Sequence, residues 1–129
     1  MIIGVPKETR PGEARVALVP AAVTALTKAT LEVLVEAGAG AAAGFPDAAY
    51  VEKGARLAPR AEVLASAVVI LAVRAPTGAA SLRRDQVLVA LLEPLDEPEA
   101  VRELAARGVT AFAMELIPRI TRAQSMDAL

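Results

Sequence analysis

Five short apolar runs, separated by segments with helical character, constrain the fold of this chain more than any other feature. The runs are Ile2–Val5, Leu31–Val35, Ala67–Val73, Val87–Leu92 and Val109–Met114. They are apolar at almost every position, which is typical of strands covered on both faces. Strands that alternate with helices at short intervals favour right-handed crossovers and a parallel sheet. The sequence therefore predicts an α/β fold, a three-layer doubly wound and mostly parallel sheet of about five strands, Rossmann-like with a flavodoxin-like strand order.

The segments between these runs carry the signals of helix ends. Pro20–Lys28 is predicted as the first helix, because proline is favoured at the first helical position. Three more predicted helices are Asp47–Lys53, Pro59–Ala65 and Asp96–Arg107. In the last of these, Asp96 is the expected N-cap and Gly108 follows as the stop. At least one predicted helix thus lies in three of the four intervals between consecutive predicted strands.

Length and composition agree with one domain that has a core of small side chains. The 129 residues are expected to form a single N-terminal α/β domain. With 55% hydrophobic and only 2% aromatic residues, the core must consist of alanine, valine and leucine. Such a core suits a parallel sheet covered by alanine-rich helices.

Several classes of function are excluded by what the chain does not contain. The net charge is -1, so no broad basic field attracts nucleic acid or an anionic membrane. There is no cysteine and no histidine, which excludes disulfides, thiol catalysis, the common zinc sites and histidine base chemistry in these residues. No apolar run is long enough for a membrane span or a signal peptide. We expect no membrane insertion by this chain and a cytoplasmic location.

A group of polar side chains follows the last apolar run. Its members are Arg119, Arg122, Gln124, Ser125 and Asp127. Pro118 ends the strand, because it lacks an N–H and fixes its own backbone. Loops that leave the carboxyl ends of strands hold the ligands of open α/β sheets. The segment is therefore a candidate contact loop, and the alternative is an ordinary solvated polar loop.

The chemistry of this loop suits a ligand that bears a carboxamide. Gln124 both donates and accepts hydrogen bonds, while Arg119 and Asp127 supply one charge each. Ser125 is the expected N-cap of a helix that begins at Met126. No residue of this set requires a metal ion.

The glycines of the segment 37–45 imitate a dinucleotide-binding fingerprint. Gly38, Gly40 and Gly44 follow the strand Leu31–Val35, but the third spacing is one residue too long. The fingerprint also needs its third glycine inside a helix, whereas Phe45 and the residues after it indicate a turn. We expect a turn before the helix at Asp47–Lys53 and no phosphate site.

Two arginines lie in charged segments that follow predicted buried strands. Arg15 lies in a loop rich in proline, glycine and charge, and Arg74 ends the run Ala67–Val73. Arg15 either binds a ligand or pairs with Glu13 or Glu8 to tie down its own loop. Arg74 is either a site residue or a side chain that snorkels at the sheet edge. If the loops after the strands gather at one end of the sheet, both arginines share a rim with the polar loop of residues 119–127.

The chain resembles a known family along its whole length. MELIPRITRAQSMDAL, residues 114–129, resembles a loop in domain I, the NAD(H)-binding component, of proton-translocating nicotinamide nucleotide transhydrogenase. MIIGVPKETRPGEARVALVP resembles the opening shared by transhydrogenase and alanine dehydrogenase, and AGAGAAAGFPDAAYVEKGA resembles the next segment of that superfamily. In the family an Arg, a Gln and an Asp contact the nicotinamide end of the nucleotide. The matching residues are Arg119, Gln124 and Asp127, with Ser125 beside them.

This resemblance implies hydride transfer between NAD(H) on this component and NADP(H) on a partner. The implied partners are the NADP(H)-binding and membrane-spanning transhydrogenase components, and the full subunit is expected to be a homodimer peripheral to the inner membrane. The nucleotide is expected to sit mainly on a following dinucleotide-binding domain, which these 129 residues lack. On this interpretation the chain is the first part of a longer subunit, and it binds NAD(H) weakly or not at all by itself.

Two other functions are compatible with the sequence. The first is the substrate domain of an alanine dehydrogenase, in which the residue matching Arg15 binds the substrate carboxylate. That family places a lysine at the position of Arg74 and a catalytic histidine after the strand Val87–Leu92, and this chain has neither. The second is a non-enzymatic interaction module of flavodoxin-like shape, since fold alone does not decide function.

Overall fold

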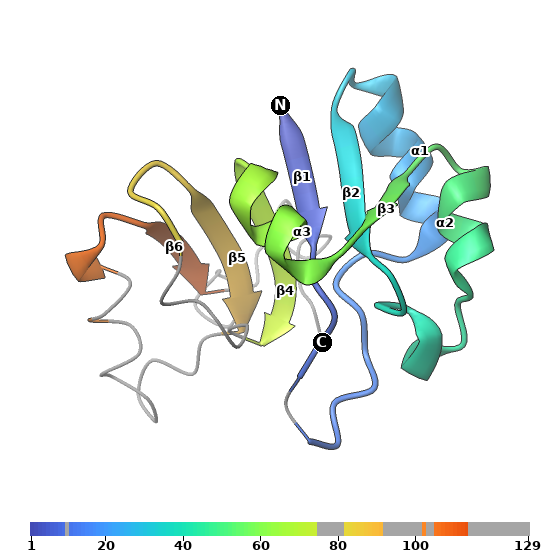
Figure 1. The fold of residues 1–129 in the computed structure, drawn as a ribbon, viewed down its shortest axis with the longest axis horizontal. Helices are drawn as coiled ribbons and strands as arrows, with labels where there is room; N and C mark the ends of the chain where they lie inside the picture. The colour runs from blue at the N-terminus through green and yellow to red at the C-terminus, as the bar shows by residue number, and fades with distance from the viewer. Residues whose placement is uncertain (10, 75–81, 92–101, 103–104, 114–129) are drawn as a thin grey trace, which may run out of the picture.

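The computed structural model describes residues 1–9, 11–74, 82–91, 102 and 105–113. Within these residues one sheet of six strands runs in the order β3-β2-β1-β4-β5-β6, and each neighbouring pair is parallel (Figure 1). The strands are β1 (Ile2–Val5), β2 (Glu32–Glu36), β3 (Arg56–Ala58), β4 (Val69–Arg74), β5 (Val87–Leu91) and β6 (Thr110–Ala113). The α/β, doubly wound, parallel architecture expected from the sequence is confirmed.

The order of the five predicted strands is the flavodoxin-like order that the sequence predicts. The sixth strand, β3, was not predicted, and it lies at the edge of the sheet beside β2. It consists of three residues, and Arg56 and Leu57 are exposed, so it leaves no apolar run in the sequence. With β3 included, the order becomes that of the doubly wound dinucleotide-binding folds.

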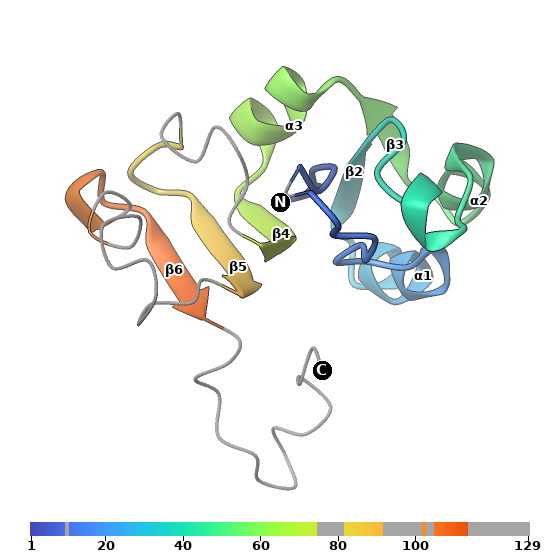
Figure 2. The same ribbon diagram turned by 90° about the horizontal axis from the view of Figure 1, so that it is seen from below.

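The helices cover both faces of the sheet. They are α1 (Pro20–Lys28), α2 (Asp47–Glu52) and α3 (Arg60–Ser66), with a short 3-10 turn, η1, at Ala41–Ala43. Figure 2 shows α1 and α2 on one side of the strands and α3 on the other. No helix in the described part of the chain is long and apolar enough to span a membrane. The predicted helix Asp96–Arg107 lies mostly outside the described residues; Arg102, Ala105 and Ala106 are helical.

The alternation of side chains along β2 divides the core into two layers. Val33 and Val35 pack in one cluster with Val23 of α1, whereas Leu34 packs with Val63 of α3 in another. Successive residues of a strand point to opposite faces, so a strand must be apolar throughout when both faces are covered. This burial explains why β2 is recognisable in the sequence as an uninterrupted run.

Gly4 lets α3 approach the central strand β1. A Cβ atom at this position would lie 2.6 Å from the Cβ of Ala67 and 3.2 Å from the backbone oxygen of Val63. Real Cβ atoms essentially never come as close as the first of these distances. The absence of a side chain on Gly4 therefore sets the separation between α3 and the strand that leads into the candidate site.

We expect Gly4→Ala to lower the free energy of unfolding by about 1–3 kcal/mol, because it overpacks a close contact. Ala67→Gly should destabilise by a separate backbone effect. The double variant should be less destabilised than the sum of the two single variants, since Ala67→Gly removes the nearest clashing atom. Urea denaturation of the four proteins measures this coupling. Strict additivity would mean that Gly4 and Ala67 are not in contact.

Candidate functional site

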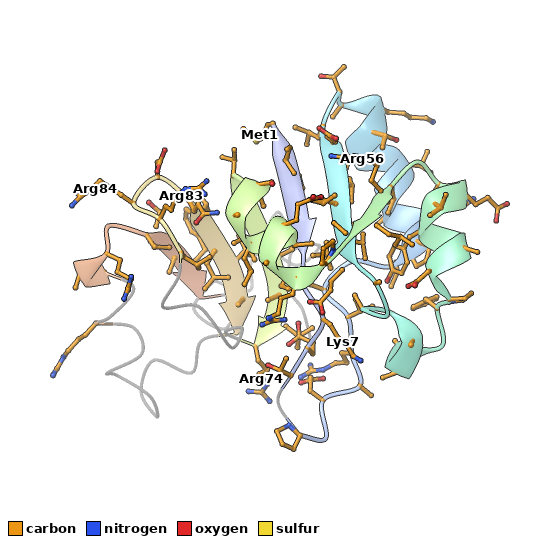
Figure 3. All side chains as sticks on the ribbon, in the orientation of Figure 1. Met1, Lys7, Arg56, Arg74, Arg83 and Arg84 are labelled. Atoms are coloured by element: carbon orange, nitrogen blue, oxygen red, sulfur yellow. The ribbon has the colours of Figure 1, made fainter. Side chains whose placement is uncertain are left out.

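The candidate site lies at the carboxyl ends of β1 and β4. These two strands are neighbours in the sheet, with Ile3 beside Val69 and Gly4 beside Ile70. The strand order reverses between them, and open α/β sheets bind ligands at such a switch point. Figure 3 shows Lys7 and Arg74 at this end of the sheet and Arg83 and Arg84 at the other.

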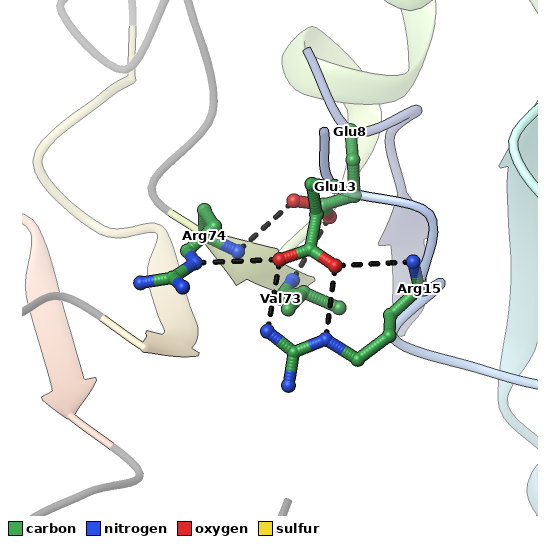
Figure 4. A network of polar contacts seen from close by, with 5 residues as sticks. All are labelled: Glu8, Glu13, Arg15, Val73 and Arg74. Carbon is green, nitrogen blue, oxygen red and sulfur yellow. Dashed lines mark hydrogen bonds and ion pairs between the residues drawn. The ribbon is translucent and has the colours of Figure 1, made fainter. Parts of the chain in front are cut away.

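Four charged side chains meet at this point. They are Glu8, Glu13, Arg15 and Arg74, here called the switch-point cluster (Figure 4). The first three come from the loop between β1 and α1, and the fourth is the last residue of β4. The sequence places proline and glycine in that loop, which keeps it irregular and lets it fold back across the sheet edge. The cluster therefore joins segments that are about sixty residues apart in the chain.

Glu8 binds the backbone at the end of β4. The N–H of Val73 donates to Glu8 Oε2 at 2.9 Å, and the N–H of Arg74 donates to Glu8 Oε1 at 3.0 Å. The register between β4 and β5 shifts between Leu71 and Arg74, which marks a bulge. A bulge disrupts the local ladder of hydrogen bonds. The Glu8 carboxylate thus binds two N–H groups at the irregular end of the strand.

Glu13 binds both arginines of the cluster. Arg15 Nε donates to Glu13 Oε2 at 2.9 Å, and Arg15 Nη2 donates to Glu13 Oε1 at 2.8 Å. Arg74 Nε donates to the same Oε1 atom at 3.4 Å. The Glu13 side chain is 7% exposed, whereas those of Arg15 and Arg74 are 44% and 25% exposed. A nearly buried carboxylate therefore lies between two partly exposed guanidinium groups.

These contacts keep the Glu13 carboxylate and the Arg15 guanidinium charged. Hydrogen bonds from the Arg15 side chain lower the pKa of Glu13 from its ordinary 4.5 to about 2, although desolvation acts in the opposite direction. The hydrogen bond to Glu13 likewise raises the pKa of Arg15. Glu13 is consequently ionised at any pH at which the protein would normally work.

The structure shows what the two arginines contact, and whether they also bind a ligand stays open. Arg15 pairs with Glu13, as one interpretation of the sequence predicts, and this pair ties down the loop. Arg74 is the last residue of β4, which lies between β1 and β5, and its partly exposed guanidinium contacts Glu13. The expectation that Arg15 and Arg74 share one rim of the sheet is confirmed.

The contact of Glu8 with the backbone of β4 was missed in the sequence, where Glu8 was only a possible partner of Arg15. The available signal was its position, since it lies three residues after the end of a buried strand in a loop that proline and glycine keep irregular. The polar loop with Arg119, Gln124, Ser125 and Asp127 lies outside the described residues. Its membership of this rim stays a prediction.

The glycine run forms a turn in which Asp47 and Tyr50 contact two of the three glycines. The N–H of Gly38 donates to Asp47 Oδ1 at 2.8 Å, and Gly44 has a φ of 90° at the end of η1. A Cβ on Gly40 would lie 2.7 Å from the ring of Tyr50. The expected turn before a helix at Asp47 is confirmed, and the run follows the carboxyl end of β2, the neighbour of β1.

A second group of charged residues is hydrogen-bonded together at the carboxyl ends of β1 and β2. Glu36 Oε1 accepts from the backbone N–H of Lys7 at 2.9 Å and from Arg60 Nη1 at 3.1 Å. The same Arg60 nitrogen donates to the backbone oxygen of Lys7 at 3.0 Å. This set positions the start of the β1–α1 loop. Among the described residues, no group of histidine, cysteine, aspartate or glutamate side chains is arranged to hold a metal ion.

Comparison with known proteins places the chain in a family. The model of the alanine dehydrogenase/PNT N-terminal domain matches residues 4–129. The chain belongs to this family. It is 41% identical over 132 aligned positions to NAD(P) transhydrogenase subunit alpha of Cereibacter sphaeroides. The alignment covers all of this chain and 25% of that protein. It is 39% identical over 119 aligned positions to alanine dehydrogenase of Bacillus subtilis. That alignment covers 91% of this chain and 32% of that protein.

A solved structure of a family member has the same fold. The transhydrogenase of Sinorhizobium meliloti matches with a TM-score of 0.92 and 43% identity, over 98% of this chain and 39% of that one. The chain thus spans a quarter to two fifths of the length of the transhydrogenase chains compared here. Its α/β domain is homologous to the N-terminal domain of the transhydrogenase alpha subunit.

We expect Glu8→Gln to loosen the end of β4. Glutamine offers one acceptor oxygen, so one of the two N–H groups loses its partner, at a cost of about 1–2 kcal/mol in unfolding free energy. Amide hydrogen exchange followed by NMR should speed up at Val73 and Arg74. The exposed Glu52→Gln of α2 is the control and should leave both rates unchanged. Unaltered exchange in Glu8→Gln would contradict the assigned contacts.

The pKa of Glu13 predicts an acid-dependent loss of stability. Because the folded-state pKa is depressed, the contribution is present above about pH 4.5 and is lost as the pH falls toward 2. We expect the unfolding free energy to fall between pH 5 and 2 by roughly 1–2 kcal/mol more in the native chain than in Glu13→Gln, allowing for solvent screening at the exposed Arg15. Equal pH profiles in the two proteins would show that Glu13 is not ion-paired.

Proposed function

We propose that this chain is the N-terminal part of the NAD(H)-binding component of a proton-translocating NAD(P) transhydrogenase. In that role it takes part in hydride transfer between NAD(H) and NADP(H). The observation that carries the proposal is likeness over the whole chain to transhydrogenase alpha subunits, in sequence and in fold. The chain spans only 25% of the length of the Cereibacter sphaeroides subunit, so the proposal assigns the activity to the whole subunit with its partners.

Arg119, Gln124 and Asp127 are the proposed catalytic and cofactor-binding residues, with Ser125 beside them at the nucleotide. They follow β6, whose carboxyl end lies at the same edge of the parallel sheet as the switch-point cluster. Hydride passes directly between the two nicotinamide rings, so the protein needs to supply position and exclusion of water rather than an acid or a base. The lack of histidine in the chain is compatible with such chemistry.

In this proposal the nucleotide is held mainly by a second, dinucleotide-binding domain. The glycine turn is compatible with this division, because the N–H of Gly38 already donates to Asp47 and the ring of Tyr50 fills the space beside Gly40. The proposed partners are the NADP(H)-binding and membrane-spanning components of the enzyme. The full subunit would form a homodimer and lie in the cytoplasm, peripheral to the inner membrane.

The alternative of an alanine dehydrogenase substrate domain is favoured by one observation, the 39% identity to the Bacillus subtilis enzyme. Oxidation of an amino acid requires a group that accepts a proton, and no histidine is present to do so. In this chain Arg15 and Arg74 are both bonded to Glu13. Alanine-dependent formation of NADH by the complete protein would establish the alternative.

We expect Gln124→Ala in the full subunit to slow hydride transfer at least tenfold while changing the affinity for NADH only a few fold. The reason is that a residue that orients the carboxamide acts on the reacting geometry more than on binding. Stopped-flow transfer between the two nucleotides and calorimetric titration of NADH measure the two effects. Arg122→Gln, in the same loop but outside the proposed set, is the matched control. Equal losses in both variants would contradict the assignment.

A second experiment tests where the nucleotide binds. NADH is titrated into this chain and into the same chain extended through the following dinucleotide-binding region. We expect heat of binding only from the extended protein. Comparable binding by the 129 residues alone would place the nucleotide site within them, and the glycine run at Gly38–Gly44 would then be the first segment to re-examine.

A further inference from the structure

The chain contains one tyrosine, Tyr50, and its side chain is fully buried beneath helix α2. The hydroxyl group donates a hydrogen bond to the backbone oxygen of Leu18 at 2.8 Å. Leu18 lies near the end of the β1–α1 loop, the loop that carries three of the four switch-point residues. A phenylalanine ring would fill the same space in the core, so the hydroxyl serves this contact rather than the packing. The contact therefore connects α2 to the loop at the candidate site.

The glycine turn leaves room for this contact. A Cβ atom on Gly40 would lie 2.7 Å from Cε2 and 2.7 Å from the hydroxyl oxygen of Tyr50, closer than real Cβ atoms come. The N–H of Gly38 donates to Asp47 at the start of α2, which ties the turn to the same helix. Two glycines of the run thus contribute to the placement of α2 and its tyrosine.

Different contacts hold the two ends of the β1–α1 loop. Glu8 holds the first part, because it binds two N–H groups at the end of β4. In the part of the chain that the structure describes, residues 16–18 make one hydrogen bond, which is the bond from Tyr50. Arg15 directly precedes this stretch. The Tyr50 contact therefore holds the part of the loop that leads from Arg15 into α1.

The position of Arg15 depends on this part of the loop. Its backbone N–H and its Nε both donate to Glu13 Oε2, at 3.1 and 2.9 Å. Without the Tyr50 hydroxyl, the buried oxygen of Leu18 could find a donor only by moving toward water, since an unpaired buried carbonyl is costly. Arg15 would move with the neighbouring backbone. Both of its hydrogen bonds would weaken, because such bonds depend steeply on geometry.

We propose that Tyr50 is a positioning residue whose hydroxyl, through Leu18, keeps Arg15 and Glu13 in place at the switch point during hydride transfer. Its role in the reaction rests on the proposed function, in which the residues at the nicotinamide follow β6 at the same edge of the sheet. Tyr50 acts through the loop and not by contact with a reactant. The effect on the loop is a property of the chain itself and is measured separately from the reaction.

The first experiment follows the loop in the 129-residue chain. Tyr50→Phe removes the hydroxyl and keeps the ring. The matched control is Thr27→Val, which removes a hydroxyl that donates to a backbone oxygen of its own helix, α1, at 3.0 Å. NMR should show hydrogen exchange at Arg15 Nε at least about threefold faster in Tyr50→Phe than in the native chain. Exchange at the Val73 amide, held from the other part of the loop, should stay unchanged, and the control should alter neither rate.

The second experiment measures the reaction in the full subunit with its partners. We expect Tyr50→Phe to slow hydride transfer at least about fivefold while the affinity for NADH stays within about twofold of the native value, because loop position affects the reacting geometry more than binding. Thr27→Val should leave both quantities near their native values. A purely structural role of Tyr50 would lower the melting temperature without this division between rate and affinity.

The outcomes separate this inference from the proposed function. A native full subunit that transfers no hydride contradicts the proposed function, and the exchange at Arg15 then decides whether Tyr50 positions the loop. If the native subunit is active, an equal transfer rate in Tyr50→Phe overturns the inference and leaves the proposed function standing. Unchanged exchange at Arg15 in folded Tyr50→Phe also overturns it.

A second variant tests the same contact from its acceptor side, and it decides the matter if Tyr50→Phe does not fold. Replacing Val19 by its α-hydroxy acid turns the Leu18 carbonyl into an ester carbonyl, which is a weaker hydrogen-bond acceptor, and leaves the tyrosine intact. Hydrogen exchange at Arg15 Nε should again become faster. An exchange rate equal to that of the native chain would show that the bond between Tyr50 and Leu18 does not position Arg15.

Discussion

The closure of the β1–α1 loop onto the end of β4 is the interaction on which the candidate site depends. Two carboxylates of this loop cross to the neighbouring strand, and each takes donors that the strand end would otherwise leave to water. Removing a carboxylate from water is costly unless it is paired and hydrogen-bonded. Both acids meet this condition, and in the described part of the chain no buried side-chain nitrogen or oxygen lacks a partner.

Contacts around the start of the β1–α1 loop hold this loop in place. Gly4 allows α3 to lie close to β1, and the Lys7–Glu36–Arg60 contacts fix Lys7, near the start of the loop, against the end of β2. The loop therefore leaves β1 in a defined direction before it reaches Glu8. The candidate site is thus carried by loops at the carboxyl ends of a parallel sheet.

Much of the fold could be predicted because burial on both faces leaves a pattern in the sequence. The run that became β2 is apolar at each of its three central positions, since Val33 and Val35 face one layer and Leu34 the other. The edge strand β3 could not be found in this way. Its short exposed segment pairs with β2 on one side only, so pairing and not apolar pattern makes it a strand.

The sequence by itself determined the architecture, the absence of histidine and cysteine chemistry, and the set of charges available after β1 and β4. Tertiary structure alone decided which carboxylate meets which donor. Glu8 and Glu13 were equal candidates for Arg15, because both lie within a few residues of it in an irregular loop. Placement of β4 beside β1 directs Glu8 to the backbone of Val73 and leaves Glu13 for the guanidinium groups. That choice depends on contacts between residues far apart in the chain, on which local pattern carries no information.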